Sequence, residues 1–172
     1  DAAFFNMCRP LELVFSNGMD KGELVGIQTG DVTKMTTFEE FFDAYKKQME
    51  YCISLMVNAD NSIDAAHAER CPLPFLSSMV DDCMKVGKTV QEGGAVYNFT
   101  GPQGFGIANM ADSLYAIRKL VYEDKKVSME EYKQALADYK QLQARATTAE
   151  RRQLGVTGVL RCGVLLKDDI EV

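Results

Sequence analysis

The 172-residue sequence lacks long apolar runs, clustered basic residues and any recognisable leader. None of its apolar runs approaches the roughly 20 residues that span a bilayer, so we expect no membrane segment. A net charge of −6 argues against nucleic acid as a partner, because phosphate recognition needs clustered Lys and Arg. The acidic first residue, with no apolar stretch behind it, does not resemble a signal peptide, and this favours the cytoplasm.

Metal-binding and nucleophilic patterns are also scarce. The five cysteines are an odd number without CxxC spacing, which argues against a disulfide framework and a zinc ribbon. His67, the single histidine, could pair with Asp64 on one helix face, but a structural or surface role is favoured. Cys71 precedes Pro72 at a predicted helix C-terminus, where the helix dipole raises a thiol pKa. We therefore expect neither a metal site nor a catalytic residue in this chain.

Apolar spacing and capping signals predict a mostly helical chain with a few short strands. The glycine-bounded, β-prone segment 95–100 is the best strand candidate. The predicted helices cover 2–16 with a kink at Pro10, 37–69 behind a Thr37–Glu40 capping box, 75–86, 107–121, and 128–144 behind a Ser128–Glu131 capping box, while 18–35 is predicted as loop. In the helix expected at 75–86, the residues expected to face inward are Phe75, Leu76, Met79, Val80 and Met84.

Two further patterns were weighed as sites. Glycines at 101, 104 and 106 lie between the predicted strand and a helix, a placement that suits anion binding. Their order fits neither the dinucleotide fingerprint nor the Walker loop, so a tight turn is favoured over a phosphate cradle. Asp81 and Asp82 would point about 100° apart on a helix, which favours a solvated role.

Two long segments carry a resemblance to a known family. Residues 64–83 (DAAHAERCPLPFLSSMVDDC) and 93–117 (GGAVYNFTGPQGFGIANMADSLYAI) resemble matching stretches of glycyl radical enzymes, and so does the opening DAAFFN. The likeness covers about residues 1–140 and points to the dehydratase/lyase branch, with hydroxyproline and glycerol dehydratases and choline trimethylamine-lyase as its nearest members. It implies a sector of a ten-stranded α/β barrel over residues 1–144, with a poorly matching tail at 145–172.

The resemblance also implies a chemistry, that of anaerobic cytoplasmic lyases. In the family, a radical stored on a backbone glycine oxidises a cysteine to a thiyl radical. The thiyl takes hydrogen from a small hydroxylated or amine substrate, and a neighbouring group is eliminated. A separate radical-SAM activating enzyme installs the radical, and the enzymes are typically homodimers.

The sequence departs from the family pattern at both radical-bearing motifs. None of its five cysteines has Glu two residues later, and no Arg-Val-[Ser/Thr]-Gly-[Phe/Tyr] motif occurs. We therefore expect an internal fragment that carries no cofactor itself and is inactive without the remaining enzyme segments. A subunit of a split enzyme and a non-enzymatic helical interaction module derived from the family remain as alternatives. A barrel fragment should expose a large apolar surface, whereas a closed core would favour the interaction module.

Two residues carry over from the family as substrate contacts. Asp1 matches an aspartate that contacts the substrate hydroxyl in the diol dehydratases. Phe4 would lie one helical turn later on the same face. The resemblance thus assigns Asp1 and Phe4 to the substrate cavity.

Overall fold

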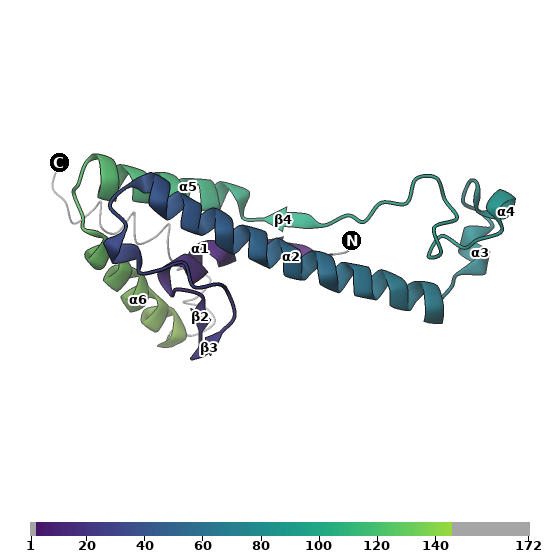
Figure 1. The fold of residues 1–172 in the computed structure, drawn as a ribbon, viewed down its shortest axis with the longest axis horizontal. Coiled ribbons are helices and arrows are strands. Elements are labelled where there is room, and N and C mark those ends of the chain that lie inside the picture. The colour runs from purple at the N-terminus through teal and green to yellow at the C-terminus, as the bar shows by residue number, and fades with distance from the viewer. Residues whose placement is uncertain (1–2, 146–172) are drawn as a thin grey trace. The chain divides into compact units, whose positions relative to one another are not determined.

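The structure, a computed structural model, describes residues 3–145, and they are mostly helical with a few short strands, as predicted (Figure 1). Two small sheets pair β1 with β4 and β2 with β3. None of the helices in this range is both long and apolar enough to cross a membrane. The elements are β1 (Phe4–Asn6), α1 (Cys8–Phe15), β2 (Met19–Asp20), β3 (Glu23–Leu24), the 3₁₀ helix η1 (Val32–Lys34), α2 (Phe38–Arg70), α3 (Pro74–Ser77), α4 (Cys83–Val86), β4 (Gln103–Phe105), α5 (Ile107–Ile117), the π-helix η2 (Arg118–Glu123) and α6 (Met129–Arg145).

The chain divides into two compact units. Among the described residues, unit 1 comprises 3–5 and 53–103, and unit 2 comprises 6–52 and 104–145. The predicted boundary between 1–144 and a tail at 145–172 follows sequence likeness, and it stays a prediction because the tail beyond residue 145 lies outside the described residues.

Unit 2 is built around an aromatic core. Phe15 stacks on Tyr132 with ring centroids 5.9 Å apart, and its ring lies 5.6 Å from that of Phe41. Leu114 and Ile117 reach this core from α5. Burial of such side chains is the main favourable term in folding, so unit 2 has its own source of stability.

The helix expected at 2–16 is wrong in its first half. That half contains β1, and α1 begins only at Cys8, whose backbone N–H donates to the Asn6 Oδ1 at 3.0 Å. Pro10 therefore falls in the first helical turn, where the missing N–H has no intrahelical partner to lose. The predicted kink is consequently absent, and α1 runs unbroken to Phe15.

Asn17-Gly18 follows the end of α1, and both residues have positive φ. The Gly18 N–H donates to the Leu13 carbonyl at 2.8 Å, which closes the helix C-terminus. A Cβ on Gly18 would lie 2.5 Å from the Ile27 carbonyl oxygen, so no other residue fits there.

The segment 18–35, expected to be loop, contains a small hairpin. β2 and β3 pair antiparallel, with Met19 opposite Leu24. The connecting residues Lys21 and Gly22 have φ of 48° and 88°. Positive φ at both positions is what a two-residue hairpin turn requires, and the Lys at the first position hid this signal.

Both predicted capping boxes are confirmed. At the start of α2, the Glu40 N–H donates to Thr37 Oγ1 at 3.2 Å and the Thr37 N–H donates to the Glu40 carboxylate at 3.3 Å. Ser128 and Glu131 make the same reciprocal pair at the start of α6. These side chains occupy donors that a helix N-terminus leaves unpaired, which is why the local sequence located both helices.

Two predictions in unit 1 are wrong. The helix expected at 75–86 is split into α3 and α4, because Asp82 has φ +73°, a left-handed conformation that a continuous helix cannot contain. The strand expected at 95–100 is absent, since these residues pair with no other segment, and the strand lies at Gln103–Phe105 instead.

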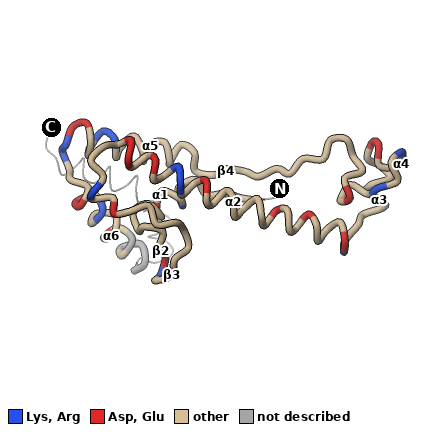
Figure 2. Tube along the Cα trace, viewed as in Figure 1, with Lys and Arg blue, Asp and Glu red and all other residues tan. Residues whose placement is uncertain are grey.

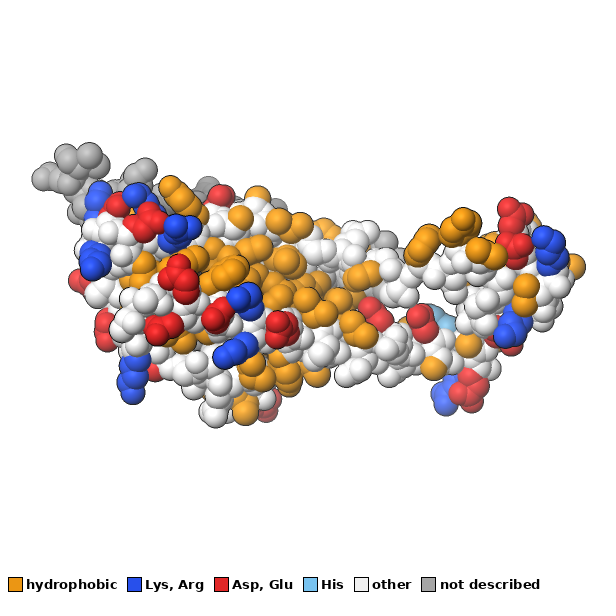
Figure 3. All heavy atoms as spheres, turned by 45° about the horizontal axis from the view of Figure 1, so that its top comes forward, with side chains coloured by type: hydrophobic (Ala, Val, Ile, Leu, Met, Phe, Trp, Pro, Cys, Tyr) orange, Lys and Arg blue, Asp and Glu red, His pale blue; other side chains and the backbone are white. Residues whose placement is uncertain are grey.

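The inward face expected at 75–86 is also wrong in most of its residues. Phe75 is 79% exposed, and only Val80 of the expected set is partly buried. Hydrophobic side chains also gather on the surface of the segment between α4 and β4 (Figure 3). The large apolar residues of unit 1 that are more than half exposed are Phe4, Phe75, Met79, Met84, Val86, Val96, Tyr97 and Phe99.

Candidate functional site

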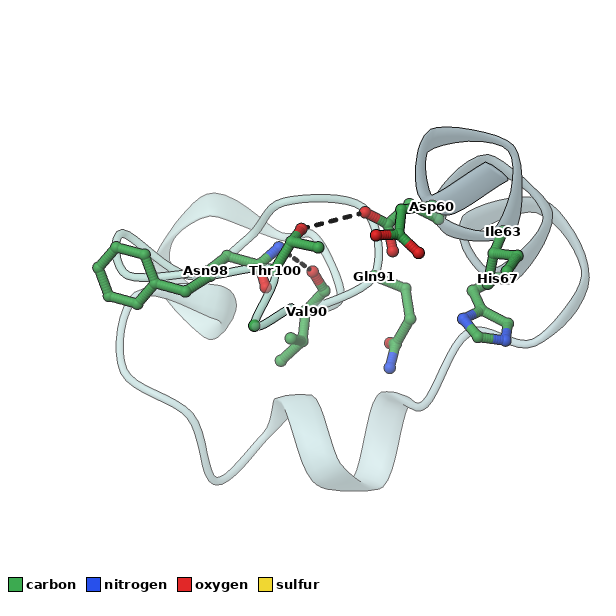
Figure 4. A pocket seen from close by; sticks show the side chains of 10 residues that line it. Asp60, Ile63, His67, Val90, Gln91, Asn98 and Thr100 are labelled. Carbon is green, nitrogen blue, oxygen red and sulfur yellow. Dashed lines mark hydrogen bonds between the residues drawn. The ribbon is translucent and has the colours of Figure 1, made fainter. Parts of the chain in front are cut away.

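Unit 1 contains a cavity of about 540 Å³ between the second half of α2 and the segments around residues 90 and 100 (Figure 4). Its size falls within the range of small-molecule sites. The lining residues are Asp60, Ile63, Asp64, His67, Val90, Gln91, Asn98, Phe99, Thr100 and Gly101.

Helix spacing brings the ionisable groups of the cavity to one wall. Asp60, Asp64 and His67 follow each other at i, i+4 and i+7 on α2 and so share a helix face. Asp60 is buried, with 8% of its surface exposed, whereas Asp64 and His67 are exposed. The pairing of His67 with Asp64, which the sequence allowed, is not among the contacts of the described residues, and His67 has the exposed position that the sequence favoured.

The opposite wall is fixed by hydrogen bonds from its own polar side chains. The Thr100 hydroxyl donates to the Asp64 carboxylate at 3.5 Å, and the Asn98 amide donates to the Val90 carbonyl at 3.1 Å (Figure 4). The Gln91 side-chain oxygen accepts from the Leu73 N–H at 3.2 Å. Within the described residues, the Asn98 side-chain oxygen and the Gln91 side-chain nitrogen make no hydrogen bond.

Metal binding and thiol chemistry find little support in the part of the chain that the structure describes. No cluster of three or more His, Cys, Asp or Glu side chains there could hold a metal ion. Cys8 and Cys83 are buried, Cys71 is exposed, and none of the described cysteines is in a disulfide. Burial raises the pKa of the Cys52 thiol, which disfavours the thiolate needed for nucleophilic attack.

The glycine loop at 101–106 has a structural role within the described contacts. Gly106 adopts φ +77° at the N-cap of α5, and its carbonyl accepts from the Cys8 thiol at 3.6 Å. A Cβ on Gly104 would lie 3.3 Å from the Met7 sulfur, a tight contact. These packing constraints support the tight turn that the sequence favoured over a phosphate cradle.

The two residues assigned to the substrate cavity by resemblance have different standing. Asp1 lies outside the described residues. Phe4 lies in β1 with 67% of its surface exposed, and it is not among the residues that line the cavity next to Asp60. Their role in substrate binding stays a prediction.

Asp81 and Asp82 do not converge on a site. Asp81 is exposed, and the Asp82 carboxylate lies 3.5 Å from the Lys85 ammonium in a solvent-exposed pair. The solvated role favoured from the sequence agrees with this arrangement.

Sequence reasoning missed Asp60. The available signal was its i, i+4 spacing from Asp64 within a stretch, residues 48–69, that contains no Lys or Arg. Burial of Asp60 depends on tertiary packing, which spacing along one helix does not report.

Comparison with known proteins places the chain beside radical dehydratases. Residues 2–150 match the family described as pyruvate formate lyase-like. A solved structure on 1,2-propanediol dehydration in Roseburia inulinivorans is 60% identical with a TM-score of 0.78, over 88% of this chain and 19% of that chain. The glycerol-bound B12-independent glycerol dehydratase from Clostridium butyricum is 43% identical with a TM-score of 0.77, over 95% of this chain and 22% of that chain.

A curated relative agrees with the structural likeness. Trans-4-hydroxy-L-proline dehydratase of Clostridioides difficile is 40% identical over 124 residues, which are 71% of this chain and 16% of that enzyme. The chain thus spans about a sixth of the length of this relative.

Proposed function

Because the chain belongs to the pyruvate formate lyase-like family, we propose that it is a fragment of a glycyl radical dehydratase or lyase that eliminates a group from a small hydroxylated or amine substrate. The match to the 1,2-propanediol structure at 60% identity carries this proposal. The names or titles of the three reported relatives mention 1,2-propanediol, glycerol and hydroxyproline. Each of these molecules bears a hydroxyl group whose C–O bond a dehydratase can break.

The residues present do not fit the radical centre itself. Both radical-bearing motifs are missing from the 172 residues, so no step of the radical transfer is assigned to this chain. We propose that residues 1–144 form a sector of the ten-stranded barrel and that Asp1 and Phe4 line its substrate cavity. The remaining segments, a radical-SAM activating enzyme and a second copy in a homodimer would complete an anaerobic, cytoplasmic enzyme.

The exposed apolar side chains of unit 1 favour this fragment over a free-standing module. Soluble proteins rarely leave many large apolar residues exposed on one segment unless another surface covers them. The closed aromatic core of unit 2 favours the alternative, a non-enzymatic helical interaction module descended from the family.

A chimera separates the two functions. The corresponding segment of the Roseburia inulinivorans enzyme would be replaced by this chain, and dehydration of 1,2-propanediol would be assayed anaerobically after activation. We expect the chimera to be active and the isolated 172-residue chain to be inactive under the same conditions. A folded but inactive chimera, or turnover by the isolated chain, would contradict the proposal that the chain is an enzyme fragment.

The same chimera tests the two proposed substrate contacts. Loss of a charged hydrogen bond to the substrate should lower kcat/KM roughly 10- to 100-fold in Asp1→Asn. Phe4→Ala should raise KM through lost packing. Lys85→Ala, whose side chain is 84% exposed, serves as the control. Unchanged kinetics in both test variants would contradict the proposal that Asp1 and Phe4 line the substrate cavity.

A further inference from the structure

We infer that the cavity beside Asp60 in unit 1 binds an organic cation, a guanidinium or ammonium group carried by a side chain or a small molecule. Nothing in the proposed radical chemistry requires this site, and the inference goes beyond that proposal. It rests on one buried carboxylate, the charge of the surrounding walls and the acceptors that point into the same space (Figure 4).

Asp60 is the first observation. More than nine-tenths of its surface is buried, and it lines the cavity. Among the described residues 3–145, no hydrogen bond or ion pair reaches its carboxylate. Its oxygens are not among the fully buried, unpaired polar atoms of the described residues, so they remain accessible from the cavity. A ligand that donates to this carboxylate would therefore meet no competing protein partner.

The charge of the walls is the second observation. No Lys or Arg occurs at 48–69 on α2 or at 89–103, the two segments that supply every lining residue. Figure 2 shows acidic residues and no basic ones along this part of α2. Asp60 and Asp64 are one turn apart, and like charges at this spacing repel. Of the residues that line the cavity, only His67 can carry a positive charge. A cation bound between the two carboxylates would relieve the repulsion.

The remaining polar groups indicate which kind of cation fits. Asp64 already accepts from Thr100, and Asn98 keeps its side-chain oxygen as an acceptor. The Gln91 side-chain nitrogen and His67 also line the space, so donors are present beside the two carboxylates. Two carboxylates provide fewer ligands than the six to eight oxygens of a calcium site. A planar guanidinium with several N–H donors, or an ammonium with three, matches this set better.

The cavity volume leaves both sources of the cation open. About 540 Å³ exceeds what a single guanidinium head group fills, so an aliphatic stem and water molecules also fit. Ile63 and Phe99 on the walls would contact such a stem.

Titration of the full 172-residue chain with ethylguanidinium tests the inference. Backbone amide NMR signals of residues 60–67 and 98–101 should shift and saturate at millimolar concentration. Ethylurea, similar in shape but uncharged, should leave the same signals unchanged at equal concentration. No saturable shift with ethylguanidinium, or equal shifts with ethylurea, would overturn the site.

Variants assign the binding to the carboxylate. Asp60→Asn should weaken ethylguanidinium binding at least 10-fold, while Glu69→Gln, an exposed acid of the same helix outside the lining, should leave it within twofold. If Asp60→Asn does not fold, as judged by circular dichroism, Asp64→Asn decides by the same criterion. Equal weakening by Glu69→Gln and the cavity variants would show nonspecific charge attraction and overturn the inference.

A second ligand distinguishes the two sources. N-acetyl-arginine amide carries the same head group with polypeptide attached. Tighter binding than ethylguanidinium assigns the cavity to an arginine side chain from another segment or protein, and weaker or equal binding assigns it to a free small-molecule cation. Either result supports the site, whereas binding of neither ligand contradicts it.

Discussion

The two units of the chain stabilise themselves by different means. Unit 2 buries a cluster of aromatic and aliphatic side chains contributed by α1, α2, α5 and α6. In the described residues of unit 1, Cys83 is the one buried hydrophobic side chain, and the other buried side chains are those of Asp60 and Ser77. Unit 2 therefore has the interior of a folded domain, whereas unit 1 is shaped by hydrogen bonds and leaves its apolar residues for another surface.

The largest expected effect comes from truncating one aromatic residue in each unit. Phe41→Ala removes a fully buried ring from unit 2 and should lower the free energy of unfolding by about 3–5 kcal/mol. Phe75→Ala in unit 1 should change it by no more than about 0.5 kcal/mol, because that ring is exposed. Urea unfolding followed by circular dichroism measures both. Comparable losses of unfolding free energy in the two variants would show that Phe75 is buried in solution and would contradict the difference between the two units.

An intermediate effect is expected from one buried polar residue in each unit. Gln48 in unit 2 is fully buried and bridges the N–H and carbonyl of Ile27, while Ser77 in unit 1 accepts from the Val90 N–H at 3.0 Å. Gln48→Ala should destabilise by roughly 2 kcal/mol and Ser77→Ala by roughly 1 kcal/mol, since each leaves backbone groups unpaired.

Hydrogen exchange resolves these two variants by position. Gln48→Ala should reduce protection of the Ile27 amide, and Ser77→Ala should reduce protection of the Val90 amide. Protection at Val90 that is already absent in the unsubstituted chain would mean that unit 1 does not hold this hydrogen bond in solution.

The smallest expected effect concerns pH. Glu131 of unit 2 and Glu92 of unit 1 both have a lowered pKa, mainly because a backbone N–H donates to the carboxylate, that of Ser128 and of Thr89 respectively. A carboxylate whose pKa is lower in the folded than in the unfolded state stabilises the folded state at any pH above the unfolded-state pKa. This stabilisation is lost as the pH falls through the folded-state pKa. Acidification below 4.5, the ordinary pKa of a glutamate, should therefore weaken the hydrogen bonds of the Ser128–Glu131 and Thr89–Glu92 pairs.

Only the pair in unit 2 opens a helix, so the measurable consequences differ. Circular dichroism should report a loss of helix as the pH falls below the ordinary value of 4.5, a loss that Glu131→Gln makes smaller and Glu92→Gln leaves unchanged. Carboxyl NMR titrations should give both groups a pKa below 4.5. An ordinary pKa for Glu92 together with a lowered one for Glu131 would confine ordered structure to unit 2.

Features fixed by neighbouring residues were predictable from the sequence. The capping boxes located α2 and α6, and apolar spacing together with capping signals identified the mostly helical class. The motif Thr89-x-x-Glu92 forms the same reciprocal hydrogen bonds as those boxes but opens no helix, because Gly93-Gly94 follows. A capping signal is thus informative only when helix-forming residues come after it.

Features fixed by distant residues were not predictable. Segment 95–100 has β-prone side chains, yet a strand needs a partner, and none is supplied by the described chain. Apolar spacing at 75–86 indicated a buried helix face, but burial needs an opposing surface. For the cavity, Asp64 and His67 were noticed from their helical spacing, whereas Asp60 was missed because the segment around residue 100 encloses it only after folding.

Among the described residues, each unit carries one deeply buried thiol, Cys8 in unit 2 and Cys83 in unit 1. Alkylating reagents reach such sulfurs only when the surrounding structure opens, so the alkylation rate of each thiol reports the rate of local opening around it. Peptide mass spectrometry after brief exposure to iodoacetamide would time the two openings independently, without any engineered label. Exposed Cys71 supplies the reaction rate of an unprotected sulfur in the same sample.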